Sequence, residues 1–573
     1  MPIRSSLDTS VADRQSFGAG YARPTDLATQ METYSRGVLK LLAHPGFTGD
    51  FTDWNADPFE DSNWKAQHQT LRWLNPLRWA ALDGDVAARA EWLRVARSWF
   101  EANVPVSTAI SPSAWGNMID GNRAIQLSLG SSLAPKDAAW FVQLLEAHRD
   151  RLMDKANIVH KNHGMHQHAG LLVVGATLRD LGAMNTAVNR MREQFLVTFD
   201  EEGADDEGAV NYHQLNIIWW RDLWERARLE GFEKPAEVEE RLERACYVLA
   251  QMALPDGQLP QIGDTVRGSV VAGLSDMTDY LRSAGAQGVR PTGTSMILER
   301  GYIVSRSGWG ETRPLKNESH ALVRYGDDIR GHSHQDRGSV HIYADGVRWL
   351  VDGGFHSYQL RHPMRLHLQS RAAHNVAFLK GVPHRDSAPV ELVGQTVSDE
   401  VHDFTLLDHG YPGDEMRRRI IYLTGPNCWL ICDSATPSVP AAVQQQWQVE
   451  PGVSVRSLDR GYRLSKSGAS LTITWLGREP RMRYVRAIEG RHAGWVGVKW
   501  KAQKAGALVT AESSEDCPQL VALISPTADF SLGIVSSKVT ARGLVSAELV
   551  RGNTLWRITS GPDGVSVHEV SSR

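Results

Sequence analysis

Apolar residues follow two different periods along this chain. Between about residues 27 and 285 they recur every three or four positions, as in "AARAEWLRVARSWFEA" and "PAEVEERLERACYVLAQMAL", which predicts stacked amphipathic helices. After residue 296 they alternate with polar residues in short runs such as "SVHIYADGVRWLVDGG", "RRRIIYLTG" and "LTITWLG", which predicts antiparallel strands. We therefore expect an α+β protein with helices first and strands second, not an alternating βαβ sheet.

The boundary between the two patterns lies where turn-forming residues gather. Residues 283–296, "SAGAQGVRPTGTSM", are rich in Gly, Pro, Ser and Thr. With 573 residues, the chain is also longer than one hydrophobic core usually organises. The sequence predicts a helical domain over residues 1–285, a linker over 286–296 and one or more antiparallel β domains over 297–573.

Composition disfavours nucleic acid and membranes as partners. The chain has 62 Lys and Arg against 66 Asp and Glu, so its formal net charge of -4 offers no global field for a polyanion or an anionic membrane. Its first residues lack the apolar stretch of a signal peptide, and no apolar run approaches the ~20 residues of a membrane span. We expect a cytoplasmic protein, or a periplasmic or secreted one whose signal segment has been removed. A homo-oligomer stays open.

The four cysteines are too few and too scattered for a disulfide framework. Cys428 and Cys432 in "CWLIC" have no second cysteine pair that would complete a zinc ribbon. We interpret both as buried strand residues.

Tryptophan is frequent, with 19 in the chain, and most are expected to fill the core. Trp54 and Trp64 differ, because "FTDWNADPFEDSNW" places them among turn formers and acids outside any helical period. These two rings are candidates to line a groove where a flat sugar face stacks.

Polar residues cluster first in "HKNHGMHQHAGLLVVGATL", residues 160–178. Asn162 is a favoured N-cap residue and His163 follows it, so we expect both at a loop-to-helix junction, where free N–H groups favour an anion such as a carboxylate. A zinc site on His163 with His166 would need a third ligand, and no carboxylate is near. The alternative for His160, His166 and His168 is that they satisfy one another and the backbone.

A second cluster, "DEEGADDEGAVNYHQLNIIWW", places six acids before Tyr212. Such acids usually form a solvated face or complement a helix dipole. Tyr212 stands at the head of the following apolar helix, where a phenol borders a polar cleft with its ring anchored in the core. A purely structural tyrosine is the alternative.

A third cluster lies in "GHSHQD". If this stretch is extended, His332, His334 and Asp336 alternate onto one face, and a His-x-His pair forms half of a zinc site. Asp352 in "LVDGG" and His374 in "AAHNVAF" lie on the next expected strands and are candidates for the remaining ligands. We interpret the following His341 as an ordinary strand residue.

The order of these motifs resembles the heparinase II/III-type polysaccharide lyases over roughly residues 30–440. The resemblance rests on Asn-His-Gly before a helix, a later helix headed by Tyr, then "GHSHQD", "DGG" and "HN". It implies an incomplete (α/α) toroid followed by an antiparallel β-sandwich. Carried over by position, it implies that Asn162 and His163 neutralise the substrate carboxylate, Tyr212 is the acid and His332 a base.

The resemblance also implies a metal site, and it has one departure. His334, Asp352 and His374 match the zinc ligands of some members, where the metal would hold the His332 strand in place. Some members have a Glu shortly after the Asn-His pair, whereas this chain has His166, to which we assign no catalytic role. No organic cofactor is implied.

These roles describe β-elimination at a 4-linked uronic-acid glycoside, which leaves a 4,5-unsaturated uronate. The C5 proton is poorly acidic while the adjacent carboxylate is charged, so two hydrogen-bond donors on that carboxylate stabilise the developing enolate. Either His332 or a Tyr212 phenolate then takes the proton, and the choice depends on the stereochemistry of the substrate.

Further substrate contacts are expected from three arginines and a tyrosine. A guanidinium pairs with both oxygens of a carboxylate, which makes Arg123, Arg330 and Arg371 candidates, although each is equally well placed for a structural salt bridge. Tyr358 after "DGGFHS" is the fourth. The near-neutral charge balance favours a carboxylated polysaccharide or oligosaccharide with few or no sulfates.

Two other classes compete with a lyase. A glycoside hydrolase on an (α/α) toroid needs two carboxylates flanking the bond, for which Asp205, Asp206, Glu207 and Asp264 are available. A non-catalytic carbohydrate-binding protein would need the aromatic residues and arginines, but not Asn162, Tyr212 and His332 together.

Overall fold

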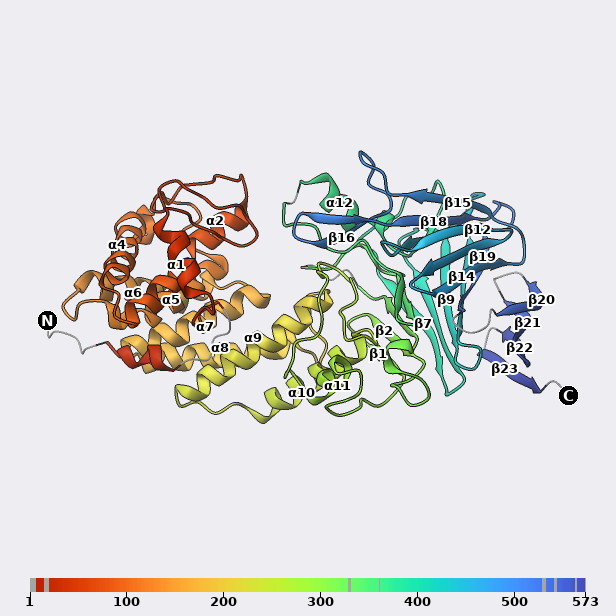
Figure 1. Cartoon of the computed structure of the whole chain (residues 1–573), viewed down its shortest axis with the longest axis horizontal. Helices are drawn as coiled ribbons and strands as arrows, with labels where there is room; N and C mark the ends of the chain where they lie inside the picture. Colours follow the sequence, from red (N-terminus) through yellow and green to blue (C-terminus); the bar gives the residue numbers. More distant parts are fainter. Residues whose placement is uncertain are drawn as a thin grey trace. The chain divides into compact units, whose positions relative to one another are not determined.

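The computed structural model describes residues 7–14, 20–327, 331–359, 361–527, 532–540, 544–561 and 564–571. It divides into two compact units (Figure 1). The helical unit comprises Met1–Glu201 with Leu215–Glu243, and the sheet unit comprises Glu202–Gln214 with Arg244–Arg573. Two long helices carry the chain between the units.

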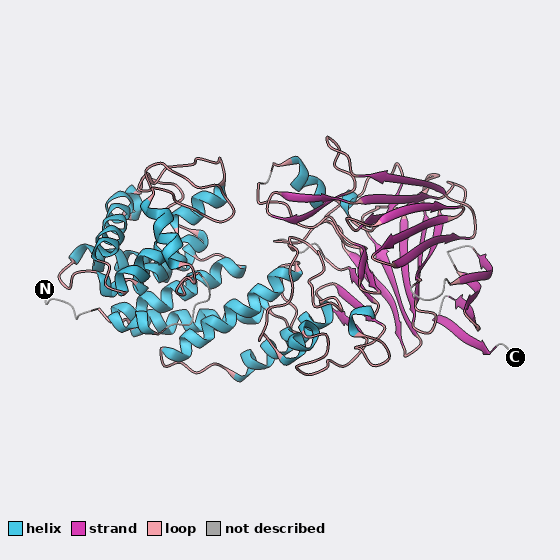
Figure 2. Cartoon of the chain, viewed as in Figure 1, coloured by secondary structure: helices cyan, strands magenta, loops and turns pink. Residues whose placement is uncertain are grey.

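Helices dominate the first half of the chain and strands the second (Figure 2). None of the helices among the described residues is long and apolar enough to cross a membrane. The helices are α1 (Leu27–Ser35), α2 (Ser62–Gln69), α3 (Asn75–Leu82), α4 (Val86–Asn103), α5 (Asn117–Leu129), α6 (Ala139–Met153), α7 (Lys161–Leu178), α8 (Leu181–Thr198), α9 (Val210–Leu229), α10 (Ala236–Met252), α11 (Asp276–Arg282) and α12 (Pro363–Gln369).

Helices α5 and α7 pack with almost no space between their backbones. A Cβ atom added to Gly121 would lie 2.2 Å from the carbonyl oxygen of His166, and one added to Gly170 would lie 2.6 Å from the Cα of Gly121. Facing glycines therefore allow α7 to lie in the centre of the helical unit. Nearly all of α7 after its first turn is buried.

The strands form two large antiparallel sheets and two small ones. The first large sheet has the order β1-β2-β3-β4-β5-β11-β18-β15, with β6 paired to β11, and the second has the order β12-β13-β14-β19-β10-β9-β8-β7. Strands β16 and β17 form a hairpin, and β20 to β23 form a four-stranded meander.

The strands have these bounds: β1 (Ser295–Leu298), β2 (Tyr302–Arg306), β3 (His320–Arg324), β4 (Val340–Ala344), β5 (Val347–Leu350), β6 (Ala377–Leu379), β7 (Val390–Val397), β8 (Val401–Asp408), β9 (Glu415–Leu423), β10 (Cys428–Thr436), β11 (Val443–Val449), β12 (Ser454–Leu458), β13 (Gly461–Lys466), β14 (Ala469–Leu476), β15 (Arg481–Arg486), β16 (Trp495–Lys499), β17 (Ala502–Ala505), β18 (Ala507–Glu512), β19 (Gln519–Pro526), β20 (Gly533–Val539), β21 (Val545–Arg551), β22 (Thr554–Gly561) and β23 (Gly564–Ser571).

The two large sheets enclose one core. Trp349 and Trp447 come from the first sheet and Trp429 and Trp475 from the second, and all four are fully buried. A face-to-face pair of sheets with alternating inward residues is a β-sandwich. The alternation seen in the sequence therefore predicted this core correctly.

The four-stranded meander covers the outer face of the second large sheet. Cys428 and Cys432 lie in the core between them, beside Leu549 and Ile558. Both thiols are free, and burial raises their pKa values to about 12. The interpretation of this pair as buried strand residues is confirmed.

The predicted fold class, an incomplete (α/α) toroid followed by an antiparallel β-sandwich, describes this chain. Helices give way to strands between Arg282 and Ser295, inside the predicted boundary. The compact units divide the chain elsewhere, because residues 202–214 and 244–282 pack with the sheets. The change from helices to strands lies where composition indicates it, whereas the boundaries between the two compact units lie elsewhere.

We expect Gly121→Ala to destabilise the helical unit by about 1–3 kcal/mol, because the new methyl group meets backbone atoms that cannot rotate away. Thermal unfolding followed by circular dichroism measures the change. Gly268→Ala is the control, since a Cβ there meets nothing within 4 Å. Equal melting curves for both variants would contradict the close approach of α5 and α7.

Candidate active site

One buried carboxylate joins two histidines in the sheet unit. Asp264 Oδ2 lies 3.0 Å from His332 Nδ1, and Asp264 Oδ1 lies 3.0 Å from His334 Nε2. The Asp264 residue is 2% exposed, and Arg365 Nη1 lies 3.6 Å from its Oδ1 atom. A carboxylate held in this way fixes the orientation of both imidazole rings.

This geometry is built by loops and not by the strand that the sequence predicts. Residues 331–338 form turns and bends ahead of β4, so the expectation that "HSHQD" is extended is wrong. Asp336 is fully buried and pairs with Arg324 at 3.6 Å. His332 and His334 come together because both bind Asp264.

Backbone contacts hold the loops in place. The Asp264 N–H donates to the carbonyl of His332 at 2.8 Å, and the His332 N–H donates to the carbonyl of Glu207 at 3.0 Å. Gly263 has a φ of +57°, and a Cβ there would lie 2.5 Å from the His332 carbonyl oxygen. Only glycine allows three loops to approach so closely at this point.

Tyr212 lies directly against His332. It stands in the first turn of α9, as the sequence predicts, and its ring stacks on the imidazole with centroids 3.5 Å apart and planes at 10°. The hydroxyl of Tyr212 forms a short hydrogen bond with that of Tyr358. A phenol that can donate a proton is therefore placed beside an imidazole that can accept one.

Burial and charge fix the protonation states of these groups. Burial, the neighbouring Tyr358 and the charge of Asp264 hold the pKa of Tyr212 well above its usual value, so the phenol keeps its proton at neutral pH. Burial and the charge of Asp264 also raise the pKa of Tyr358 to about 12. Burial alone would raise the pKa of Asp264, but hydrogen bonds from His332 and His334 hold it well below its usual range.

The hydrogen bond to Asp264 also decides which nitrogen of His332 acts. An ionised carboxylate only accepts, so Nδ1 carries the proton and Nε2 carries the lone pair. The His332 side chain is 17% exposed, so part of the imidazole is open to solvent. The arrangement is suited to moving a proton off carbon.

A second cluster lies next to this one. Asp352 Oδ2 is 3.1 Å from His374 Nδ1 and 2.9 Å from His341 Nε2, and the rings of His334 and His374 lie 5.5 Å apart. Asp352 follows β5 in a loop, and His374 ends a short 3-10 turn, so neither lies on the strand that the sequence predicts. His341, interpreted from the sequence as an ordinary strand residue, contacts the same carboxylate oxygen.

The donors of this cluster suit a divalent metal in type. Five buried atoms lack a hydrogen bond, namely His334 Nδ1, His341 Nε2, Asp352 Oδ2 and both ring nitrogens of His374. Two ligand atoms on one tetrahedral zinc lie about 3.3 Å apart. The distances from Asp352 Oδ2 to His341 Nε2 and His374 Nδ1 are close to this value. The described part of the chain nevertheless contains no group of three such residues already arranged as a metal cage.

Asn162 and His163 lie in the first turn of α7, within the helical unit. The N-cap residue is His160, so Asn162 is not the cap that the sequence predicts. Asn162 is 6% exposed, and His163 is partly exposed. A Cβ on Gly164 would lie 2.0 Å from the Val159 carbonyl oxygen, which explains the glycine of the Asn-His-Gly motif.

The neighbouring histidines are structural. His166 packs edge to face on Trp219, and burial lowers its pKa to about 3. Burial lowers the pKa of His168 to about 4. Both rings are therefore neutral at physiological pH.

Two candidates for substrate contacts, Arg123 and Arg371, make internal contacts instead. Arg123 is fully buried, donates to the Gln69 carbonyl at 2.7 Å, and stacks 3.7 Å from the centre of the Trp99 ring. Arg371 pairs with Asp408 at 3.0 Å. Neither guanidinium is available to a substrate carboxylate. Arg330 lies outside the described residues.

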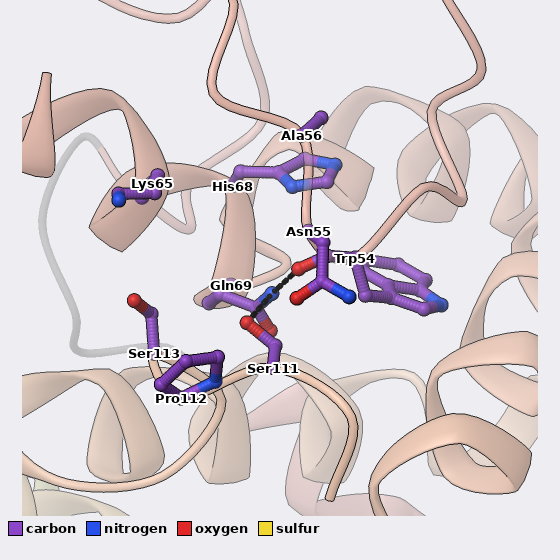
Figure 3. A pocket seen from close by; sticks show the side chains of 9 residues that line it. All are labelled: Trp54, Asn55, Ala56, Lys65, His68, Gln69, Ser111, Pro112 and Ser113. Atoms are coloured by element: carbon purple, nitrogen blue, oxygen red, sulfur yellow. Dashed lines mark hydrogen bonds between the residues drawn. The ribbon is translucent and has the colours of Figure 1, made fainter. Parts of the chain in front are cut away.

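The two candidate stacking tryptophans are buried as well. Trp64 is 0% exposed in a cluster with Leu39 and Leu41, so its ring offers no face to a sugar. Trp54 is 3% exposed and borders a cavity of about 150 Å³ that also includes His68 and Ser111 (Figure 3). Its ring stacks on His68, so aromatic packing accounts for it.

Three of the four carboxylates considered for hydrolysis are buried, and Asp206 is partly exposed. Asp264 is held by two imidazoles, and Glu207 and Asp205 are each 1% exposed. Asp205 lies 3.5 Å from His213. The hydrolase interpretation therefore has no exposed pair of carboxylates among these residues.

Sequence reasoning missed several members of the site. Asp264 was noted only as a hydrolytic acid, Arg365 was not noted, and His341 was assigned to packing. The contacts of Asp264 with His332 and Arg365 join distant segments, which no local pattern indicates, whereas His341 meets Asp352 across the β4–β5 hairpin.

Comparisons with known proteins agree with this architecture. The family model "Heparinase II/III N-terminus" matches residues 32–284, and "Heparinase II/III-like, C-terminal" matches residues 294–518. No protein with a curated description matches by sequence.

Several solved structures share the fold. A heparinase III has a TM-score of 0.72 at 16% identity, covering 96% of this chain and 91% of its own. Heparan sulfate lyase HepC from Pedobacter heparinus has a TM-score of 0.69 at 16% identity, covering 99% and 92%. Chondroitin AC lyase from Streptomyces coelicolor, bound to chondroitin sulphate, has a TM-score of 0.59 at 11% identity, covering 98% and 92%.

We expect Asp264→Asn to cost about 1–3 kcal/mol of stability at pH 7, because His332 and the buried His334 lose an ionised partner. The wild-type carboxylate has a lowered pKa in the folded state, so its contribution is present above its ordinary pKa of about 3.9 and is lost as the pH falls further. Urea unfolding from pH 7 down to pH 3 measures both. A stability difference that does not shrink below about pH 4 would contradict an ionised Asp264.

Proposed function

This chain belongs to the heparinase II/III-like family of polysaccharide lyases, and we propose that it cleaves 4-linked uronic-acid glycosides by β-elimination. The observation that carries the proposal is the arrangement of Tyr212, His332 and Asp264. It supplies a protonated phenol and an oriented imidazole within one stacked pair. The product is a 4,5-unsaturated uronate.

The substrate is proposed to be a uronic-acid-containing polysaccharide or oligosaccharide. Two of the proteins with this fold are described as acting on heparan sulfate and chondroitin, both glycosaminoglycans. Support within this chain comes from the proton-transfer pair, since elimination needs a carboxylate beside the acidic carbon. A uronate supplies it.

Asn162 and His163 are proposed to neutralise that carboxylate. Hydrogen bonds from an amide and an imidazole lower its effective charge, which makes the C5 proton more acidic and stabilises the enolate-like state that follows. Both residues lie in the first turn of α7, where the positive end of the helix dipole adds to the attraction for an anion.

His332 is proposed as the base and Tyr212 as the acid. The lone pair at His332 Nε2 takes the C5 proton, while Asp264 stabilises the imidazolium through Nδ1–H. A raised pKa makes a Tyr212 phenolate scarce at neutral pH and suits this group to donating its proton to the departing O4. Tyr358 is a positioning residue, because its hydroxyl is bonded to that of Tyr212.

A divalent metal such as zinc is proposed at His334, Asp352 and His374, with His341 as a further donor. When bound, the metal supplies positive charge to the buried nitrogen and oxygen atoms that lack a hydrogen bond. His334, as one of its ligands, would also remain bound to Asp264, which orients the ring of His332. The elimination itself needs no metal-activated water.

We expect wild-type protein to produce ultraviolet absorbance from a conjugated C4–C5 double bond on at least one uronate polysaccharide. Tyr212→Phe should lower kcat by about 100- to 10,000-fold, because the leaving oxygen loses its proton donor. A panel of glycosaminoglycans and unsulfated polyuronates measures this.

Tyr358→Phe is the matched control, since it removes the hydroxyl on the other side of the same hydrogen bond. We expect it to retain at least about a tenth of wild-type kcat. Equal losses of kcat in Tyr212→Phe and Tyr358→Phe would show that the two hydroxyls act together as the acid, and would contradict Tyr212 as the sole acid. New reducing ends without absorbance would contradict elimination.

For the metal, we expect purified protein to contain about one divalent ion per chain, and His374→Ala to lose it. Elemental analysis measures the content, and thermal unfolding after chelation should show a lower midpoint for wild type only. Unchanged metal content in His374→Ala would contradict the assigned ligands.

A further inference from the structure

Two acid-free segments of the sheet unit lie against each other. Residues 353–371 contain three Arg and three His, residues 490–511 contain four Lys or Arg and one His, and neither contains Asp or Glu. The Gly497 N–H donates to the Gly353 carbonyl and the Lys501 N–H to the His356 carbonyl, each at 2.7 Å. These bonds place the turn of the β16–β17 hairpin along the loop that follows β5.

Helix α12 lies beside the β16–β17 hairpin (Figure 1). Trp495 of β16 packs against Met364 and Leu368 of α12, and the rings of His367 and His492 stack at 5.6 Å. The hairpin is therefore a fixed part of the sheet unit. Its basic residues are held beside those of the loop.

Several of these cations have no acid partner. Arg365 and Arg371 lie beside Asp264 and Asp408, and their charges are compensated. Lys499, Lys504 and Arg361 are exposed, and none of them forms an ion pair within the part of the chain that the structure describes. Fixed positive charge without a partner attracts anions.

His356 reports the local potential. It is 5% exposed, and its ring stacks on that of His362 at 4.5 Å. Burial first, and then the charges of His362, Lys501 and Arg365, lower its pKa to about 4. Of these neighbours, Lys501 and Arg365 are cations.

The basic region is continuous with the proton-transfer residues. The half-buried ring of Trp500, in the hairpin turn, lies 5.5 Å from the ring of Tyr358 and 6.0 Å from that of Phe355. Tyr358 in turn binds Tyr212 through its hydroxyl. An aromatic ring flanked by Lys499 and Lys501 thus lies one residue away from the proposed acid.

We propose that Lys499, Trp500 and Lys501 form a subsite for an anionic substituent on a sugar next to the cleaved bond. The ring supports a sugar face, and the two ammonium groups pair with a sulfo group or a carboxylate. This inference rests on the proposed lyase function. It specifies substrates that carry charge on the neighbouring unit, although the balanced net charge alone favours few sulfates.

The test removes the two charges and keeps the ring. Lys499→Gln with Lys501→Gln should raise KM for a sulfated glycosaminoglycan by about tenfold at low ionic strength, with kcat little changed, and salt should reduce the effect. The charge-matched control is Arg456→Gln with Arg463→Gln, an exposed cross-strand pair on β12 and β13. The control should leave KM within about twofold of wild type.

Substrate chemistry separates the two sources of the anion. A KM increase on the sulfated chain that disappears on its chemically desulfated form identifies a sulfo group. A similar increase on an unsulfated polyuronate, with a carboxylate on every unit, identifies a carboxylate. Unchanged KM on all of these substrates, or an equal increase in the arginine control, would overturn the subsite.

Binding measurements distinguish failure of the subsite from failure of the lyase proposal. Isothermal titration of Tyr212→Phe with the same chains, with and without the two lysine changes, reports affinity when no cleavage occurs. About tenfold weaker binding without the lysines supports the subsite even if wild type produces no absorbance. Equal affinity overturns it. Single Lys499→Gln, at the exposed end of β16, serves if the double variant does not fold.

Discussion

The site depends on one carboxylate that two imidazoles share. Asp264 is buried, and an unpaired charge there would be prohibitively unfavourable. His332 and His334 stabilise it, and in return it fixes which nitrogen of His332 carries the lone pair. The same contact connects the proposed base with the proposed metal ligands, since His334 belongs to both clusters. Burial and the charge of Asp264 also keep the adjacent Tyr212 protonated, so the same carboxylate acts on the proposed acid and on the proposed base.

The fold could be predicted because its causes are local. A helical period before residue 285 and alternation after 296 depend on which face of each element is buried, and the structure changes from helix to strand between Arg282 and Ser295. Packing could not be predicted in the same way. Residues 202–214 pack with the sheets, and the Glu207 carbonyl accepts a backbone hydrogen bond from His332, a contact between distant segments.

Only part of the site could be predicted from the sequence. Tyr212 was found because a polar ring at the head of an apolar helix is a local anomaly, whereas the argument that placed His332 and His334 on a strand was wrong. The partner Asp264 carries no sequence signal for its role, because His332 and His334 lie 68 and 70 residues further along the chain. Arg123 and Trp64 were selected as substrate contacts because of their charge and ring size, but both are buried in the helical unit. Residue type alone does not distinguish a binding residue from a core residue.

Elimination and hydrolysis differ in whether water enters the product, and mass spectrometry of a defined uronate oligosaccharide cleaved in ¹⁸O-water tests this directly. A lyase acting through Tyr212 and His332 gives two fragments whose masses sum to that of the substrate, with no solvent oxygen in either. Fragments that together gain one water, labelled with ¹⁸O, would show hydrolysis and contradict the proposed proton transfer between these residues and the sugar.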